Sequence, residues 1–235
     1  MKTSPEQKSA RPRVALSFDD AVSNQATVVA PLLAEYGFGA TFYITEFTGD
    51  GDDRFETDKR QYMDWRQIAK LHELGFEIGN HTWHHFNIGR LDPQTILTEI
   101  EVIEQRCAEH GIPQPRTFAY PGSHESVVAY EILKRKGYLC ARSGYDRAYQ
   151  PAEDSIWSIP SFVITGESEE LFQQALCRAV KGENVIFTFH GIPDYNHPWV
   201  TTPPEVFLRM MDALQQTGLP VVSVKDLVGA IQKSA

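Results

Sequence analysis

The sequence predicts one α/β domain, built on a parallel sheet that closes or nearly closes into a barrel of about seven strand–helix units. Short apolar runs alternate with longer segments of helical periodicity along most of the 235 residues. Apolar runs without polar alternation are typical of strands buried on both faces, as in a parallel sheet covered by helices. No linker-like tract interrupts this alternation, which favours a single domain.

The first half of the chain contains four expected strands with helices between them. The strands are predicted at 13–18, 39–45, 76–80 and 116–120, and the helices at 24–37, 63–75 and 92–111. Ser23 is the candidate N-cap of the first helix. Asp64 and Gln67 have the spacing of a capping box. Asp92 followed by Pro93 marks the start of the clearest helix.

The second half continues the alternation less regularly. Helices are expected at 125–137, 168–182, 203–218 and from 225 onward, and strands at 138–142, 184–190 and 220–224. A looser region at 143–167 contains the apolar segment WSIPSFVI. Residues 1–12 are expected to form a flexible tail, residues 13–235 the domain, and the acidic insert 47–61 an exposed loop.

The composition excludes several classes of partner. A net charge of −9 disfavours nucleic acid and anionic membranes, and no apolar run reaches the length of about 20 residues that spans a bilayer. Cys107, Cys140 and Cys177 are widely spaced and are expected to be buried thiols, which favours a reducing compartment. With no apolar leader in the sequence we expect a cytoplasmic protein; the alternative is an exported one whose signal peptide this sequence lacks. The sequence leaves the oligomeric state open.

Three polar clusters follow directly after apolar runs. Asp19 and Asp20 end the first strand, His81 to His85 follow the third, and His190 ends the strand at 184–190. In parallel α/β barrels functional residues gather at the carboxyl ends of the strands. These clusters are therefore expected to meet at one end of the barrel.

The spacing of His81 and His85 would place two imidazoles on one face of a helical turn, able to share a cation. An anionic partner is available in Asp19 and Asp20, whose side chains are expected to point in different directions, one as ligand and one as base. Two histidines and one aspartate leave positions open for water and substrate, as hydrolysis requires. Either motif alone could be surface histidines or a solvated acidic turn. Together they favour a metal site, with His84 as a bystander.

The segments SFDDA, HTWHH and FHG resemble the signature motifs of the polysaccharide deacetylase family, the NodB-homology domain of carbohydrate esterase family 4. The resemblance runs from about residue 13 to about residue 229, in the expected order. It implies a distorted (β/α) barrel and one divalent transition metal, most often zinc, with cobalt or another ion as alternatives. It implies three metal ligands: Asp20, His81 and His85.

The resemblance also assigns the proton transfers. Asp19 would be the general base for the attacking water, and His190 the general acid that protonates the departing amine or alcohol. Thr82 would support the histidine loop through its hydroxyl. The aspartate that tunes the acid histidine in the family is not recognisable here, and Asp146 and Asp154 are its candidates.

The third motif departs from the family pattern, because FAYPGS at 118–123 stands where RPPYG is usual. Ala119 occupies the arginine position and Gly122 the tyrosine position. The backbone N–H of Gly122 can still serve an oxyanion hole. Arg142 is the candidate replacement for the charge that orients the base, with a surface ion pair as the alternative, and Tyr120 is a further candidate for contact with the base or substrate.

Aromatic side chains are candidates for stacking on sugar rings. Trp199 is the foremost, because it lies in a long polar loop after the acid histidine; Trp83, Trp157 and Tyr145 could stack or simply pack. Asp194 and His197 in the same loop either contact substrate or are solvated.

These residues predict a metal-dependent hydrolase that removes acetyl groups, N-acetyl favoured, from an amino-sugar oligomer or polysaccharide. The alternatives are an acetyl-ester hydrolase on xylan-like glycans and an amidase on a small non-carbohydrate amide. A catalytically silent glycan-binding module is disfavoured, because all five motif residues are retained. A nucleotide-binding protein is disfavoured because no glycine-rich phosphate loop follows the first strand.

Overall fold

The computed structural model describes residues 14–46 and 61–233. Within them a parallel sheet has the strand order β2-β3-β4-β5-β6-β7-β1-β8, and a further pairing of β1 with β2 closes it. Seven strands form the closed barrel. The short β8 pairs with the first half of β1, and β2 pairs with its second half. The prediction of a distorted (β/α) barrel is confirmed.

The strands are β1 Val14–Phe18, β2 Thr41–Ile44, β3 Glu77–Asn80, β4 Thr117–Ala119, β5 Cys140–Tyr145, β6 Ile159–Val163, β7 Val185–Phe189 and β8 Val221–Val222. The predicted strands are found in order and most are shorter than predicted, but β5 extends three residues beyond its predicted end and β6 was not predicted as a strand. β6 arises from the looser region at 143–167, within its one apolar segment. Its ladder with β5 shifts register between Arg142 and Tyr145, which explains why the pattern there was irregular.

The helices are α1 Ala30–Tyr36, α2 Trp65–Glu73, α3 Pro93–Glu109, α4 Val127–Arg135, α5 Glu169–Val180, α6 Pro204–Gln216 and α7 Val224–Gln232; a π-helical turn at Gln25–Val29 precedes α1. The capping box of Asp64 with Gln67 and the Asp92 cap are both confirmed. The Ser23 cap is wrong, because helical backbone already begins at Ser23 and the N–H of Gln25 bonds to the Val22 carbonyl.

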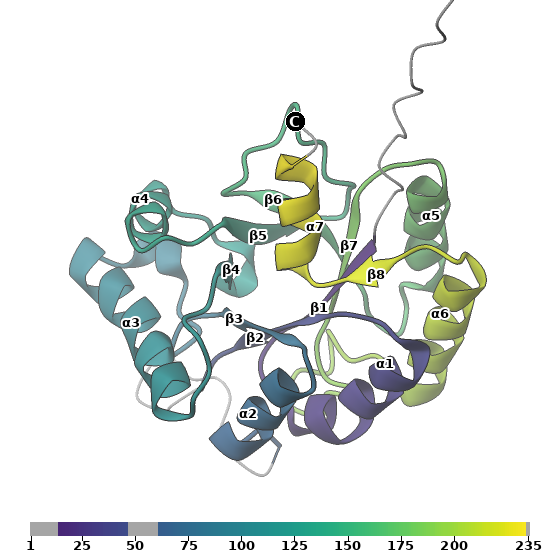
Figure 1. The fold of residues 1–235 in the computed structure, drawn as a ribbon, viewed down its shortest axis with the longest axis horizontal. Coiled ribbons are helices and arrows are strands. Elements are labelled where there is room, and N and C mark those ends of the chain that lie inside the picture. Colours follow the sequence, from purple (N-terminus) through teal and green to yellow (C-terminus); the bar gives the residue numbers. More distant parts are fainter. Residues whose placement is uncertain (1–13, 47–60, 234–235) are drawn as a thin grey trace, which may run out of the picture.

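Helices α1 to α6 surround the strands (Figure 1). The largest apolar cluster lies between them and the outer face of the barrel. Phe18 on β1 stacks on Phe42 and Phe189, and Phe207 from α6 packs edge-on against Phe18 and Phe189. Burying each such ring contributes about 2 kcal/mol to stability, so this aromatic layer fixes the neighbouring strands β2, β1 and β7 against their helices.

A second cluster fills the barrel interior and is covered by α7. Ala15, Tyr43, Cys140 and other inward side chains pack with Val224, Leu227 and Val228 of that helix. The first backbone N–H groups of α7 bond to Thr41 and Glu77, which begin β2 and β3. Helix α7, near the middle of the view in Figure 1, therefore covers the amino-terminal end of the barrel.

Some expectations concern residues outside the described ranges: the tail at 1–12, and all but the last residue of the acidic insert at 47–61.

Cys107 and Cys140 are buried as predicted, but Cys177 is exposed, because it lies on the outward face of α5. Among the described residues, no helix is both long enough and apolar enough to cross a membrane.

The buried carboxylate of Glu77 makes stability depend on pH. It accepts hydrogen bonds from the Thr41 and Thr117 hydroxyls and from the Lys225 N–H, yet burial raises its pKa above the ordinary value. A pKa raised by folding favours the folded state at low pH, and that contribution is lost as pH rises through the folded pKa. We therefore expect Glu77→Gln to gain stability relative to wild type as pH rises above the ordinary pKa of a glutamate.

Urea unfolding of both proteins at several pH values measures this difference. Glu73→Gln, an exposed change on α2, is the control and should track wild type. A Glu77→Gln difference that stays constant or falls with rising pH would contradict the prediction.

Candidate active site

Backbone strain marks the carboxyl end of the barrel. Among the described residues, the non-glycine positions with positive φ all lie at or just after strand ends: Asp20, Ala21, Thr82, His85, Ser123, Tyr145 and Asp146. Each such conformation costs on the order of 1–3 kcal/mol and persists only where its surroundings enforce it. Strain concentrated at one end of a barrel points to a functional site there.

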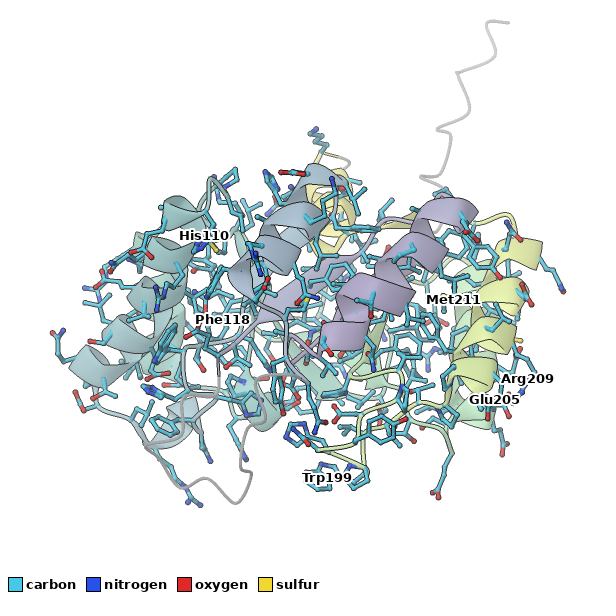
Figure 2. The ribbon with its side chains drawn as sticks, turned by 90° about the horizontal axis from the view of Figure 1, so that it is seen from below. His110, Phe118, Trp199, Glu205, Arg209 and Met211 are labelled. Atoms are coloured by element: carbon cyan, nitrogen blue, oxygen red, sulfur yellow. The ribbon has the colours of Figure 1, made fainter. Side chains whose placement is uncertain are left out.

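The same end holds a cavity of about 300 Å³. It is lined by most of the residues that the sequence proposed for catalysis, metal binding or substrate contact: Asp19, Asp20, His81, His85, Tyr120, Gly122, Arg142, His190, His197 and Trp199. The further candidates for substrate contact, Trp83, Tyr145, Trp157 and Asp194, are not among its lining residues. Trp199 lies at the lower edge of the molecule in Figure 2 and is 59% exposed, so it forms part of the rim. The structure thus brings the three polar clusters together, while the role of each residue stays a prediction.

Asp20, His81 and His85 are spaced for one metal ion. The Asp20 Oδ1 atom lies 3.5 Å from His81 Nε2 and 3.4 Å from His85 Nε2. Four ligands about 2.0 Å from a tetrahedral zinc ion lie about 3.3 Å from one another. The Oδ1 atom is buried and has no hydrogen-bond partner among the described residues, which is costly unless a cation satisfies it. The three side chains therefore fit a divalent ion.

The two histidines reach this position through a strained turn, and the expected helical turn is wrong. Residues 81–87 are neither helix nor strand, and Thr82 and His85 have φ of 65° and 60°. His81 Nδ1 lies 2.8 Å from the Ala119 carbonyl and donates to it, which leaves Nε2 facing Asp20. The Thr82 hydroxyl accepts from the N–H of His85, the supporting contact expected for it. His84 points elsewhere and bonds to Glu99 at 2.6 Å.

Electrostatics favour an ionised Asp20 and a neutral His85, the protonation states in which these two groups bind a metal. Burial acts to raise the pKa of Asp20, but the neighbouring histidines, His85 foremost, lower it well below the ordinary value. Burial lowers the pKa of His85 to about 4. Asp20 is thus ionised and His85 neutral at neutral pH, with its lone pair available. For His81, burial acts to lower the pKa, but Asp19 and Asp20 raise it above the ordinary value.

Asp19 is held by Arg142 and also lies close to one histidine, with its Oδ2 atom 3.8 Å from His81 Nε2. The Nη2 atom of Arg142 lies 2.6 Å from Asp19 Oδ1 and 2.5 Å from Oδ2, and both side chains are buried. The guanidinium lies over the Tyr43 ring, 5.1 Å from its centroid. Arg142 is the cross-strand neighbour of Ala119 on β4. The alternative of a surface arginine is wrong.

A row of small hydroxyl side chains supports this ion pair from inside the barrel, and the sequence reasoning missed it. Ser161 lies 3.5 Å from Arg142 and accepts from Thr188, which contacts Ser17 at 3.0 Å. Gln25 donates to the carbonyls of Asp19 and, more weakly, His190, joining the ends of β1 and β7. The available signal was a lone hydroxyl residue within each of three apolar strands.

His190 ends β7 and is partly exposed in the cavity. Its Nδ1 atom is buried and has no hydrogen-bond partner within the described ranges. Neither sequence candidate for a tuning carboxylate reaches it. Asp146 accepts the N–H of Val163, and Asp154 pairs with Arg147 at 2.6 Å. Both proposals were wrong, because each carboxylate is already bonded within its own loop region.

Asp194 and His197 are not solvated. Both are buried, and His197 Nδ1 lies 3.4 Å from Asp194 Oδ2 and 3.7 Å from Asp20 Oδ2. Burial acts to lower the pKa of His197, but Asp194 and Asp20 raise it above its ordinary value. The loop after β7 therefore folds back towards the Oδ2 atom of Asp20, whereas His81 and His85 lie near its Oδ1 atom.

The family model of polysaccharide deacetylases matches residues 6–141, more than half of the chain. This chain belongs to the polysaccharide deacetylase family. A comparison with curated proteins gave no match.

Solved structures share the fold at low identity. The chitin deacetylase of the fungal pathogen Colletotrichum lindemuthianum has 18% identity and a TM-score of 0.66, covering 93% of this chain and 88% of that one. The Xyl-CE4 domain of a multidomain xylanase from the hindgut metagenome of Trinervitermes trinervoides has 17% identity and a TM-score of 0.62, covering 95% and 92%. A pseudoenzyme of carbohydrate esterase family 4 from Bacillus anthracis has 16% identity and a TM-score of 0.63, and the match covers 94% of this chain and 66% of that one.

Within this deacetylase fold, the altered third motif has a structural explanation. The family arginine position is Ala119 on β4, and Arg142 stands beside it on β5 at the same level of the barrel. Arg142 therefore pairs with Asp19 from the strand next to the one where the resemblance places the arginine. Gly122 lies in the turn that follows β4 with φ of 56°, and it lines the cavity.

The aromatic candidates divide into two groups. Trp83 is partly buried, with the Arg106 guanidinium 5.4 Å from its ring centroid, and Trp157 packs against the cluster around Phe118. These two pack. Tyr145 and Trp199 are exposed, at 59% each, and of the two Trp199 lines the cavity.

We expect Arg142→Met to destabilise the deacetylase domain by about 3–5 kcal/mol, because it leaves the Asp19 carboxylate buried without its partner. Adding Asp19→Asn to that variant should recover part of the loss. Urea unfolding at neutral pH measures both. Arg147→Met, which breaks the more exposed pair with Asp154, is the control and should cost about 1 kcal/mol or less. Equal losses for the two arginine variants would contradict a structural dependence on the buried pair.

Proposed function

We propose that this protein is a metal-dependent hydrolase that removes acetyl groups, N-acetyl favoured, from an amino-sugar oligomer or polysaccharide. The observation that carries the proposal is the buried Oδ1 atom of Asp20, without a hydrogen-bond partner among the described residues and 3.4 to 3.5 Å from two imidazole nitrogens. Asp19 and His190 line the same cavity. Membership of the polysaccharide deacetylase family supports this assignment.

Asp20, His81 and His85 would hold the ion, which we take to be zinc or another divalent transition metal. A bound ion of this kind polarises an acyl carbonyl and lowers the pKa of a water molecule. The histidine Nε2 atoms are already directed at Asp20 by the Nδ1 bond of His81 and by the strained turn, so little reorganisation is needed on binding.

The proton transfers fall to Asp19 and His190. Asp19, oriented by Arg142, accepts a proton from the attacking water. His190 delivers a proton to the departing nitrogen or oxygen. The backbone N–H of Gly122 is the donor for the negative oxygen of the tetrahedral intermediate, since Gly122 lines the cavity.

The substrate side of the proposal rests on the cavity and its rim. A volume of about 300 Å³ accommodates an acetyl group with part of one sugar ring. The exposed rings of Trp199 and Tyr145 suit the apolar faces of pyranosides. The chitin deacetylase and the xylanase-linked domain named above act as precedents for carbohydrate substrates.

One observation favours the second candidate, acetyl-ester hydrolysis. His190 Nδ1 lacks a hydrogen-bonded carboxylate among the described residues. A carboxylate partner strengthens imidazole in proton transfer, and an amine leaves only once protonated, whereas an alcohol leaves with less assistance. Xylan-like acetyl esters are therefore tested beside the amides.

Acetate release from three substrates tests the function: N-acetylglucosamine oligomers, peptidoglycan fragments and acetylated xylan. We expect release from one class, lost with chelator and restored by zinc or cobalt, because the carbonyl needs the cation. Release that is insensitive to metal would contradict the metal requirement. No release from any of the three, with metal demonstrably bound, would reject the carbohydrate assignment and favour a small amide.

Substitution of Asp19 and of Asp20 should have different effects on metal binding and on turnover. Asp20→Asn is expected to lose both bound metal and activity, because it removes the negative charge that holds the cation. Asp19→Asn should keep the metal and lose about 10²- to 10⁴-fold in kcat, because it removes the base. Metal content by mass spectrometry and kcat on the best substrate measure the two effects. An Asp19→Asn protein with normal kcat would remove Asp19 from the base role.

A further inference from the structure

We propose a second divalent-cation site in the cavity, formed by Asp20, Asp194 and His197 and joined to the first through the Asp20 carboxylate. The Oδ1 atom of Asp20 faces His81 and His85. Its Oδ2 atom faces His197 instead, at 3.7 Å from Nδ1. One carboxylate thus presents a different oxygen to each group of ligands, which is the geometry of a bridging ligand.

The second group is buried and carries excess negative charge. Asp20, Asp194 and His197 are 4%, 3% and 5% exposed, and one ligand atom from each lies within 4.8 Å of the others. Two carboxylates held together away from water need a compensating positive charge. Either a protonated His197 or a cation can supply it.

The distances favour a cation. A charged imidazole bonded to a carboxylate closes to about 2.7–2.9 Å. The imidazole of His84 lies 2.6 Å from the carboxylate of Glu99 in this chain, so a close histidine–carboxylate contact is found elsewhere in the fold. His197 Nδ1 instead lies 3.4 Å from Asp194 Oδ2 and 3.7 Å from Asp20 Oδ2. These separations resemble the 3.4 and 3.5 Å within the first group, and suit ligands around an ion.

The loop holds Asp194 ready for this role. Its Oδ1 atom accepts the N–H groups of Asn196 and His197, and its own N–H donates to the Thr201 hydroxyl. The Oδ2 atom receives only a long contact from the Gly191 N–H, at 3.4 Å, and is left turned towards His197. A carboxylate fixed through one oxygen is a preorganised ligand through the other.

Two carboxylate oxygens and one imidazole nitrogen suit zinc or manganese, with further positions open to water or substrate. Ions that share a bridging carboxylate in two-metal sites lie about 3.5–4 Å apart. The second ion would lie on the Trp199 side of Asp20, because the His197 and Trp199 rings are in contact, 5.5 Å between centroids. It would therefore face the rim where substrate enters.

Zinc stoichiometry tests the site without reference to turnover. The full chain is stripped with chelator, titrated with zinc and measured by calorimetry and mass spectrometry. We expect two zinc ions per wild-type chain and one for Asp194→Asn and for His197→Ala. Asp194→Asn retains an Oδ1 acceptor for the loop, so it decides the result if His197→Ala does not fold. His72→Ala, near Glu77 at the other end of the barrel, is the control and should keep two.

Manganese provides a second readout. Two ions bridged by one carboxylate couple magnetically, so wild type with two manganese ions should give a broad paramagnetic resonance signal. Asp194→Asn should give the six-line signal of an isolated ion.

Three results would overturn the second site: one zinc in saturated wild type, two zinc ions in both variants, or loss of the second ion in His72→Ala. Loss of both ions in Asp194→Asn would also overturn it, since the sites would not be separable. The inference shares only Asp20 with the proposed function. If wild type binds one ion, and that ion is lost in His81→Ala but kept in Asp194→Asn, the second site is rejected and the proposed function stands. If wild type binds no ion, the second site and the proposed function are both contradicted.

Discussion

The buried ion pair of Asp19 and Arg142 is the contact on which the rest of the site depends. Asp19 follows β1 and Arg142 lies on β5, and two further strands separate them in the sheet. They meet only because the sheet closes and both side chains point into the same interior. A charged pair this deeply buried is tolerated because hydroxyl groups and the Tyr43 ring line its surroundings. The site is therefore assembled only when the barrel closes.

The position of Asp19 determines the direction in which the side chain of Asp20 can point. Asp20 has φ of 73°, so the chain reverses direction at once and the second carboxylate points towards the histidines. The turn from His81 to His85 also contains residues with positive φ, Thr82 and His85. Two adjacent carboxylates thus acquire different surroundings. Asp19 is paired with a guanidinium and lies 3.8 Å from one imidazole, whereas Asp20 lies 3.4 to 3.5 Å from two imidazoles. This separation suits one to accept protons and the other to bind a cation.

The long loop after β7 contributes residues to the site that lie outside the family's signature motifs. Asn24 ties the loop to the segment after β1 through Ile192 and Pro193. Asp194 and His197 are thereby brought against Asp20, while Trp199 stays on the rim. A pseudoenzyme shares this fold, so the fold alone does not establish activity. The chemistry depends on which side chains the strand ends carry.

The sequence by itself determined the β/α alternation, most helix starts and the metal motif, because each is encoded by residues within a few positions of one another. Asp64 with Gln67 and the His81 to His85 spacing are such local signals. The tertiary structure alone decided the partner of Arg142, which lies 123 residues from Asp19, and the burial of Asp194 and His197. It also decided that Cys177 faces solvent and that no described carboxylate hydrogen-bonds to His190 Nδ1. These contacts join distant strands and loops, and only closure of the barrel fixes which of them meet.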